Sequence, residues 1–192
     1  MTRLTWVRHG PTHAKGMVGW RDLPADLSDT GLIARLDQAL PADAAVISSD
    51  LVRARDTATA LQGTRLRLPD EAGLREFDFG AWDGMVFDSI SDRDPLLSRA
   101  FWETPGDVAA PGGESWNDLA ARVDAAVDRL CHAHAGRDLV VVAHFGVILT
   151  QVRRALGCTP YEALAYRIDN FSMTETRHTG SSWQSGRINH LV

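Results

Sequence analysis

Three short apolar segments, separated by longer amphipathic stretches, constrain the fold of this 192-residue chain most strongly. They are RLTWVRH at 3–9, AAVISS at 44–49 and DLVVVAH at 138–144. The last has a continuous aliphatic centre, which is typical of a strand covered on both faces. Each of the three segments therefore predicts a buried strand, and each ends in polar or charged side chains.

Helical patterns occupy the sequence between these segments. Residues 32–40 repeat leucine and isoleucine at helical spacing behind the capping candidates Ser28 and Asp29. From 116 to 134 apolar residues recur at i, i+3, i+4 and i+7, which predicts one long amphipathic helix. Alternating strands and helices predict an α/β fold, a three-layer α/β/α sandwich around a mostly parallel mixed sheet.

The carboxyl ends of parallel strands meet at one edge of a sheet, where ligands of such folds bind. In this chain Arg8 and His9 end the first apolar segment, Ser48 to Asp50 end the second, and His144 ends the third. We therefore expect these distant residues to converge.

One hydrophobic core suits a chain of this length, so we expect residues 1–192 to form a single domain. The segment at about 85–113 interrupts the pattern with three prolines and three glycines, and has one weak helical pattern from Leu96 to Trp102. We interpret it as a lid-like insertion over the strand ends. The C-terminal segment has stretches of alternating and β-branched residues around the turn-like Thr179-Gly180-Ser181, which predicts antiparallel strands.

Composition excludes several partners. A net charge of -5 without any basic run argues against nucleic acid. No apolar run approaches the roughly 20 residues that span a membrane, and the N-terminus does not resemble a signal peptide. Two cysteines are too few for a disulfide framework, so we expect a cytoplasmic protein. Nothing in the sequence indicates an oligomeric state.

Four motifs carry a family resemblance. They are VRHGPT at 7–12, SSDLVRARDTA at 48–58, LREFDFGAWDG at 74–84 and VVVAHFGVI at 140–148. In order and approximate spacing they resemble the histidine phosphatase superfamily, also called the phosphoglycerate mutase-like family. PGGES at 111–115 and the segment from Asn170 to His190 look like further family features. The resemblance implies a phosphoglycerate mutase-like fold and a phosphoric monoester hydrolase of the phosphatase branch.

The resemblance also assigns roles. It implies that His9 is the phosphorylated nucleophile, that Arg8, Arg53 and His144 form the phosphate pocket, and that Glu76 is the general acid and base. These residue types suit the chemistry, because guanidinium groups bind phosphate in a bidentate way and a neutral imidazole attacks phosphorus. A carboxyl group with a raised pKa protonates the leaving alcohol and then activates water. No metal or organic cofactor is implied.

Three further residues are candidates for substrate binding: Lys15, Gly19 and Phe145. Lys15 is the nearest counterpart of an asparagine that contacts phosphate in the family, and is either a phosphate ligand or an exposed loop lysine. Gly19 lies in a loop that is shorter than in the mutases. Phe145 replaces a common glycine, and it either forms a wall of the site or packs into the core.

The expected function is a metal-independent phosphomonoesterase whose partners are a small phosphorylated metabolite and inorganic phosphate. Residues 85–110 carry five acidic side chains against two arginines, which suits a neutral or cationic leaving group. Size and layout also resemble the α-ribazole phosphate phosphatases. A phosphoglycerate-type mutase and a non-catalytic phosphate-binding module remain as alternatives.

Two other patterns are rejected. CHAHAGR at 131–137 has the cysteine-to-arginine spacing of protein tyrosine phosphatases, but that loop follows a strand and begins a helix. Here Cys131 lies on the apolar stripe of a helix that is ending. The pairs His132 with His134, and His9 with His13, have no further ligand at a spacing typical of metal sites.

Overall fold

The computed structural model describes residues 1–192 and has one six-stranded sheet with the order β3-β2-β4-β1-β5-β6. The strands are β1 (Thr2–Arg8), β2 (Ala45–Ser48), β3 (Leu66–Arg67), β4 (Leu139–Ala143), β5 (Met173–His178) and β6 (Trp183–Ser185). The pairs β1–β4, β2–β4 and β2–β3 are parallel, whereas β1–β5 and β5–β6 are antiparallel. The prediction of a mostly parallel mixed sheet is therefore confirmed, including its antiparallel C-terminal strands.

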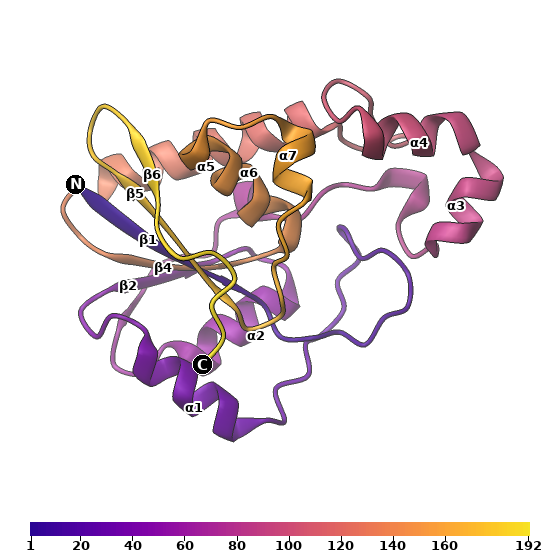
Figure 1. Ribbon diagram of the computed structural model, residues 1–192. Helices are drawn as coiled ribbons and strands as arrows, with labels where there is room; N and C mark the ends of the chain where they lie inside the picture. Colours follow the sequence, from indigo (N-terminus) through magenta and orange to yellow (C-terminus); the bar gives the residue numbers. More distant parts are fainter.

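Helices cover both faces of the sheet. They are α1 (Thr30–Ala39), α2 (Val52–Leu61), α3 (Phe87–Arg93), α4 (Pro95–Glu103), α5 (Trp116–Ala133), α6 (Phe145–Leu156) and α7 (Pro160–Leu164), with short 3-10 helices at Ala72–Leu74 and Gly80–Trp82. In Figure 1, α1 and α2 lie on one side of the sheet, and α5 and α6 lie on the other. This is the three-layer α/β/α sandwich that the sequence predicts. None of the helices is long and apolar enough to cross a membrane.

The sheet separates two hydrophobic clusters, and β4 contributes to both. Val140 and Val142 belong to the smaller cluster beneath α1 and α2, while Leu139, Val141 and Ala143 belong to the larger one. Alternate side chains of a strand point to opposite faces. The continuous aliphatic run of β4 is thus explained, because all five of its residues are buried between two helical layers.

The long helix α5 begins and ends as its sequence pattern predicts. Ser115 caps it, and Asp118 completes a capping box by accepting a hydrogen bond from the Ser115 backbone N–H. Cys131 is buried on this helix, and burial raises the pKa of its thiol to about 11. A thiol in that environment is a poor nucleophile. The rejection of a tyrosine phosphatase loop agrees with this placement.

The insertion contains one helix more than the sequence indicates. The pattern from Leu96 to Trp102 lies within α4, but α3 precedes it with only Ile90 fully buried. A seven-residue helix with a single buried side chain leaves no periodic signal. Both helices project past one end of the sheet (Figure 1). A single domain over residues 1–192 stays a prediction.

Candidate active site

The carboxyl ends of β1 and β4 bring two histidines together. Arg8 and Ala143 are paired in register, so His9 and His144 leave neighbouring strands at the same level. Their ring centroids are 5.0 Å apart, with the ring planes tilted by 60°. The expected convergence of these strand ends is observed.

Two hydrogen bonds hold the His9 ring. Nδ1 lies 2.6 Å from the carbonyl oxygen of Gly10, which requires Nδ1 to carry the proton, and Nε2 accepts a bond from Arg53 Nε at 3.2 Å. His9 is only 6% exposed, and burial together with the nearby Arg53 lowers the pKa of His9 to about 3. The imidazole is therefore neutral, with its lone pair on Nε2.

Gly10 follows the end of β1, at a position where no larger residue fits. A Cβ there would lie 2.7 Å from the Phe171 ring and 2.9 Å from the carbonyl oxygen of Asp26. The backbone N–H of Gly10 donates to Thr57 Oγ1 at 3.0 Å. This bond anchors the backbone at Gly10, the residue whose carbonyl oxygen orients His9.

Arg53 reaches the site from the first turn of α2 and is fully buried. Its terminal nitrogens donate to backbone carbonyls, Nη1 to Arg21 at 2.9 Å and Nη2 to Gly19 at 2.7 Å. Arg53 therefore points Nε at His9, whereas its two terminal nitrogens point at backbone carbonyls. Gly19, expected to bind substrate, instead positions this arginine and does not line the cavity described below.

Arg8 and His144 have unused hydrogen-bonding capacity. Arg8 Nη1 donates to the carbonyl oxygen of Ile168 at 2.7 Å, but its buried Nε has no partner within the protein. His144 is fully buried, and neither of its ring nitrogens has a partner within the protein. Leaving a buried donor unpaired costs about 1–3 kcal/mol. Burial lowers the pKa of His144 well below its usual value, so its ring is neutral with one N–H.

The buried carboxyl group of Glu76 lies against the first turn of α6. Both carboxyl oxygens accept from the backbone N–H of Gly146, at 3.0 and 3.1 Å, and Oε1 also accepts from Phe77 N–H at 3.0 Å. Burial is the main cause of a raised pKa for Glu76, although these N–H groups oppose it. The carboxyl group thus holds its proton to a higher pH than an exposed glutamate.

A support that the sequence analysis missed holds the backbone around Glu76. The Arg122 guanidinium pairs with Glu114 at 2.7 Å and donates to three carbonyl oxygens, those of Gly73, Arg75 and Glu76. Trp20 Nε1 donates to the same Glu76 carbonyl at 2.8 Å. PGGES at 111–115 contains Glu114 and was the available sequence signal, whereas nothing in the local sequence marks Arg122.

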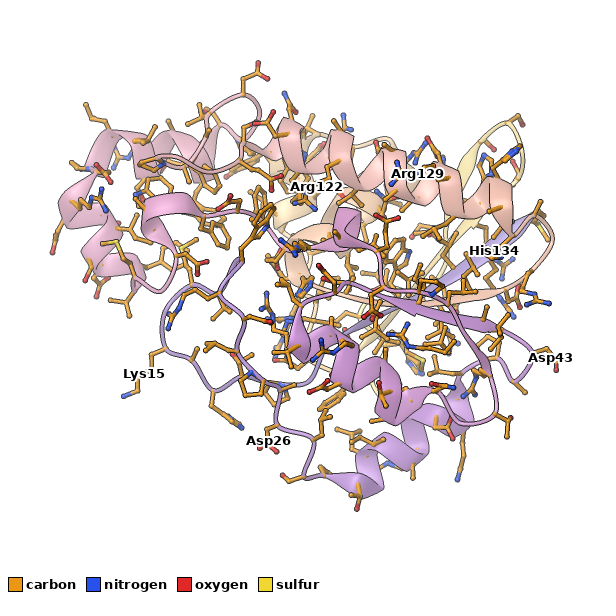
Figure 2. The ribbon with its side chains drawn as sticks, turned by 180° about the vertical axis from the view of Figure 1, so that it is seen from behind. Lys15, Asp26, Asp43, Arg122, Arg129 and His134 are labelled. Carbon is orange, nitrogen blue, oxygen red and sulfur yellow. The ribbon has the colours of Figure 1, made fainter.

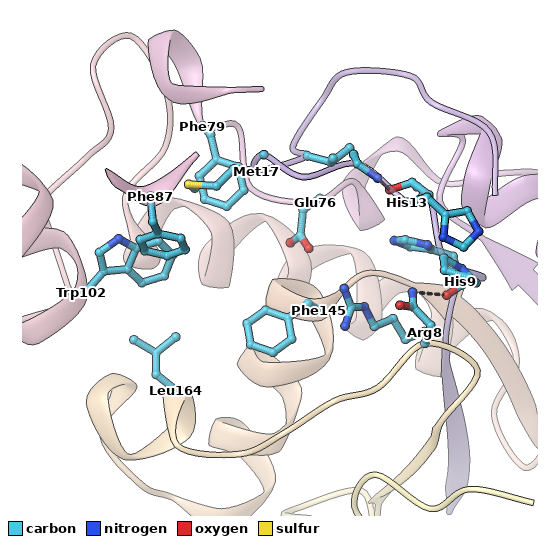
Figure 3. Close-up of a pocket in the computed structure, with 16 residues that line it drawn as sticks. Arg8, His9, His13, Met17, Glu76, Phe79, Phe87, Trp102, Phe145 and Leu164 are labelled. Carbon is cyan, nitrogen blue, oxygen red and sulfur yellow. Dashed lines mark hydrogen bonds between the residues drawn. The ribbon is translucent and has the colours of Figure 1, made fainter. Parts of the chain in front are cut away.

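Arg8, His9 and Glu76 line one cavity of about 820 Å³. Its polar end holds Arg8, His9, Glu76 and Asn170, and its other walls include Met17, Phe79, Phe87, Trp102, Phe145 and Leu164 (Figure 3). Arg53 and His144 do not line it and reach the site through their contacts with His9. No group of three or more His, Cys, Asp or Glu side chains is arranged to hold a metal ion.

The remaining sequence candidates differ in their placement. Lys15 is exposed, points away from the body of the protein in Figure 2, and does not line the cavity, so it is an exposed loop lysine in this structure. Phe145 does both things considered for it, because it lines the cavity and packs against the larger core cluster. Its ring centroid is 5.5 Å from the Arg8 guanidinium carbon.

Two further polar residues that line the cavity, Asn170 and His13, were not among the predicted site residues. Asn170 donates from Nδ2 to the His9 carbonyl oxygen at 2.7 Å. His13, considered only as half of a metal pair, lines the cavity with Nε2 2.8 Å from Asp26 Oδ2. Asn170 begins a segment that resembles the family, but single asparagines are too common in loops to identify a site.

Comparison with known proteins agrees with the fold and the motifs. The model of the histidine phosphatase superfamily (branch 1) matches residues 4–191. A bifunctional protein of Mycobacterium tuberculosis is 37% identical over 169 residues, which cover 81% of this chain and 44% of that protein. The match therefore spans less than half the length of that relative.

Two further proteins are similar over larger shares of their length. The metal-independent phosphoserine phosphatase of Arabidopsis thaliana is 32% identical over 161 residues, covering 77% of this chain and 66% of that protein. The structure of the mycobacterial glucosyl-3-phosphoglycerate phosphatase with inorganic phosphate superposes with a TM-score of 0.84 at 28% identity. It covers 98% of this chain and 97% of that one.

Proposed function

This chain belongs to the histidine phosphatase superfamily, branch 1, and from that premise we propose that it is a metal-independent phosphomonoesterase. It releases inorganic phosphate from a small phosphorylated metabolite through a phosphohistidine intermediate. One observation carries the proposal: the unprotonated Nε2 of a buried, neutral His9 shares a cavity with a buried carboxyl group, Glu76.

In the first step His9 Nε2 attacks phosphorus, and the bond between phosphorus and the alcohol oxygen breaks. The imidazole is ready for this because Gly10 holds the proton on Nδ1. Glu76, whose pKa is raised by burial, gives its proton to the leaving oxygen. The products are a phosphohistidine and a free alcohol.

In the second step Glu76 acts as a base. Its carboxylate takes a proton from a water molecule, the water oxygen bonds to phosphorus, and the bond from phosphorus to Nε2 breaks. Inorganic phosphate leaves, with His9 neutral and Glu76 protonated again. Every atom comes from the ester and water, so no further reactant is required.

The phosphoryl group is held by Arg8, Arg53 and His144. Charge spreads over its three equatorial oxygens during transfer, and fixed donors stabilise that charge. Arg53 Nε and the His144 ring lie next to the nucleophile, and Arg8 lines the cavity beside it. Each charge-assisted bond contributes about 1.5–3 kcal/mol.

Labelling of His9 tests this function. The protein is mixed with an excess of a phosphate ester, quenched within milliseconds in alkali, and assayed for an acid-labile, alkali-stable phosphoryl group. We expect labelled wild-type protein, steady release of phosphate, and neither in His9→Ala. Tight phosphate binding without label or release would instead identify a phosphate-binding module. Interconversion of 2- and 3-phosphoglycerate without phosphate release would identify a mutase.

A further inference from the structure

The end of the cavity away from His9 is walled by apolar side chains from distant parts of the chain. Phe87 and Trp102 come from α3 and α4, Phe145 and Leu164 from α6 and α7, and Met17 from the loop after β1. Figure 3 shows Phe87 and Trp102 together at the far end, with Phe145 and Leu164 on one side and Met17 on the other. The planes of the two rings are tilted by 40°. Together with Phe79 we call these residues the apolar compartment.

Glu76 lies between His9 and this compartment. Figure 3 places its carboxyl group between the imidazole of His9 and the Phe87–Trp102 pair. The oxygen that receives a proton from Glu76 is the one that joins phosphorus to the alcohol. A phosphoryl group bound at His9 therefore directs the carbon skeleton of the alcohol into the apolar compartment.

The arginine and histidine side chains that line the cavity belong to its other end, and Arg8 comes nearest to the apolar compartment, with its guanidinium carbon 5.5 Å from the Phe145 ring centroid. They are Arg8, His9 and His13, and all three lie on the phosphoryl side in Figure 3. The two arginines of the insertion are paired with acids, Arg93 with Asp94 and Arg99 with Glu103, and neither lines the cavity. Beyond Phe145, a carboxylate placed against Phe87 and Trp102 would lose water without gaining a cationic partner.

The aromatic pair at the far end offers surface to a ligand. Phe87 is 53% exposed, and its ring centroid is 5.3 Å from that of Trp102. An aromatic or aliphatic group bound against these rings removes apolar surface of both partners from water. The same insertion carries an excess of acidic residues, which disfavours a second anion near its surface.

We propose that the substrate is a phosphate monoester of an apolar alcohol, preferably an aromatic one, that carries no second anionic group. This inference rests on the proposed function and specifies its substrate class. It also sets this chain apart from the relatives named for phosphoserine and glucosyl-3-phosphoglycerate, because both of those compounds carry a carboxylate.

The test compares three esters of unactivated primary alcohols, so that leaving-group chemistry stays similar. They are 2-phenylethyl phosphate, 2-hydroxyethyl phosphate and 3-phosphonooxypropanoate, which carries a carboxylate. We expect kcat/KM to be at least tenfold higher for 2-phenylethyl phosphate than for either of the others. A kcat/KM for the carboxylate ester that equals or exceeds that of the phenyl ester would overturn the inference.

Two variants locate the effect. In Phe87→Ala the ratio of kcat/KM for the phenyl ester to that for the hydroxyethyl ester should fall at least fivefold, mainly through KM. Leu96→Ala is the matched control, because Leu96 is 84% exposed in the same insertion and does not line the cavity. An unchanged ratio in Phe87→Ala, or an equal fall in Leu96→Ala, contradicts the placement of the alcohol.

The two proposals fail in different ways. Absence of phosphate release from all three esters, with no labelled His9, removes the proposed function and the substrate class with it. Labelled His9 and efficient release from the carboxylate ester alone keep the phosphatase and refute the apolar substrate.

Discussion

Burial acts in opposite directions on the pKa values of His9 and Glu76, and both shifts favour the neutral form. The pKa of His9 falls to about 3, and that of Glu76 rises above its usual value. Removal of either group from water penalises its charge. A single physical cause thus favours the unprotonated imidazole of His9 and the protonated carboxyl group of Glu76, which is the combination that the proposed first step requires.

Replacement of the Glu76 carboxyl group tests its role as proton donor. Glu76→Gln should slow hydrolysis of an alkyl phosphate about 10²–10⁴-fold, because general acid catalysis contributes about that much. Hydrolysis of 4-nitrophenyl phosphate, whose leaving group needs no proton, should slow far less in its phosphorylation step. Single-turnover rates for the two esters measure this difference. Equal losses would show that Glu76 does not protonate the leaving group.

The buried histidines predict how stability depends on pH. An unfolded histidine binds a proton below about pH 6.5, but native His9 does not until about pH 3, so His9 destabilises the native state as pH falls through that window. His144 acts in the same direction. Glu76 acts oppositely, because its native form keeps a proton above the unfolded pKa of 4.5 and its contribution declines as pH rises.

Urea denaturation at pH 7, 6 and 5 in phosphate-free buffer measures this dependence. The free energy of unfolding of the wild type should fall faster below pH 6.5 than that of His144→Gln, by up to about 1.4 kcal/mol per pH unit. Parallel curves for the two proteins would mean that His144 binds its proton equally in the native and unfolded states.

The first turn of α6 serves the site through its backbone as well as through the side chain of Phe145. Gly146 N–H bonds to both oxygens of Glu76, and a Cβ at this position would lie 2.5 Å from Oε1 and 2.6 Å from the Phe77 ring. Glycine is therefore required here by a close approach. In the motif HFG at 144–146, His144 is a phosphate-pocket candidate, Phe145 lines the cavity and Gly146 contacts Glu76.

Gly146→Ala should displace the Glu76 carboxyl group and lower kcat on alkyl phosphates by roughly 10–100-fold, since small misplacements cost about that much. Circular dichroism should show the helices retained. Gly31→Ala in α1 is the matched control, because its Cβ would meet Asp29 Oδ1 at an ordinary 3.5 Å. Wild-type kcat in Gly146→Ala would show that the carboxyl position is not critical.

The whole molecule has cationic and neutral donors gathered at one end of its sheet. Arg8 Nε and the His144 ring lack partners within the protein, and Arg53 is fully buried beside them. An anion that binds only the native state stabilises it by mass action. Bound phosphate should therefore raise the melting temperature.

At a phosphate concentration near 100 times its Kd, the stabilisation is about 2.7 kcal/mol. For a chain of this size that corresponds to a shift of about 5–11 °C. Differential scanning fluorimetry with phosphate, against sodium chloride at equal ionic strength, measures it. Arg53→Met should lose most of the shift, and a shift of the same size in sodium chloride would exclude a specific site.

Local patterns were sufficient to predict the layers of the fold. The aliphatic run at 139–143, the cap at Asp29 and the stripe of α5 each lie within a few turns or one strand, so neighbouring residues reveal them. The convergence of Arg8, His9 and His144 followed as well, because the ends of parallel strands share one edge. Helix α3, with one buried side chain, left no such pattern.

Side-chain positions that depend on contacts between distant segments could be found only from the tertiary structure. The apolar compartment joins residues from 17 to 164, Arg122 of α5 supports the backbone of Glu76, and Arg53 turns its terminal nitrogens to the backbone. Lys15 points outward while its neighbours Ala14 and Gly16 line the cavity. Periodicity and motifs depend on residues that are close together in the sequence. The direction of a side chain and the composition of a cavity wall depend on which remote segments of the chain pack together.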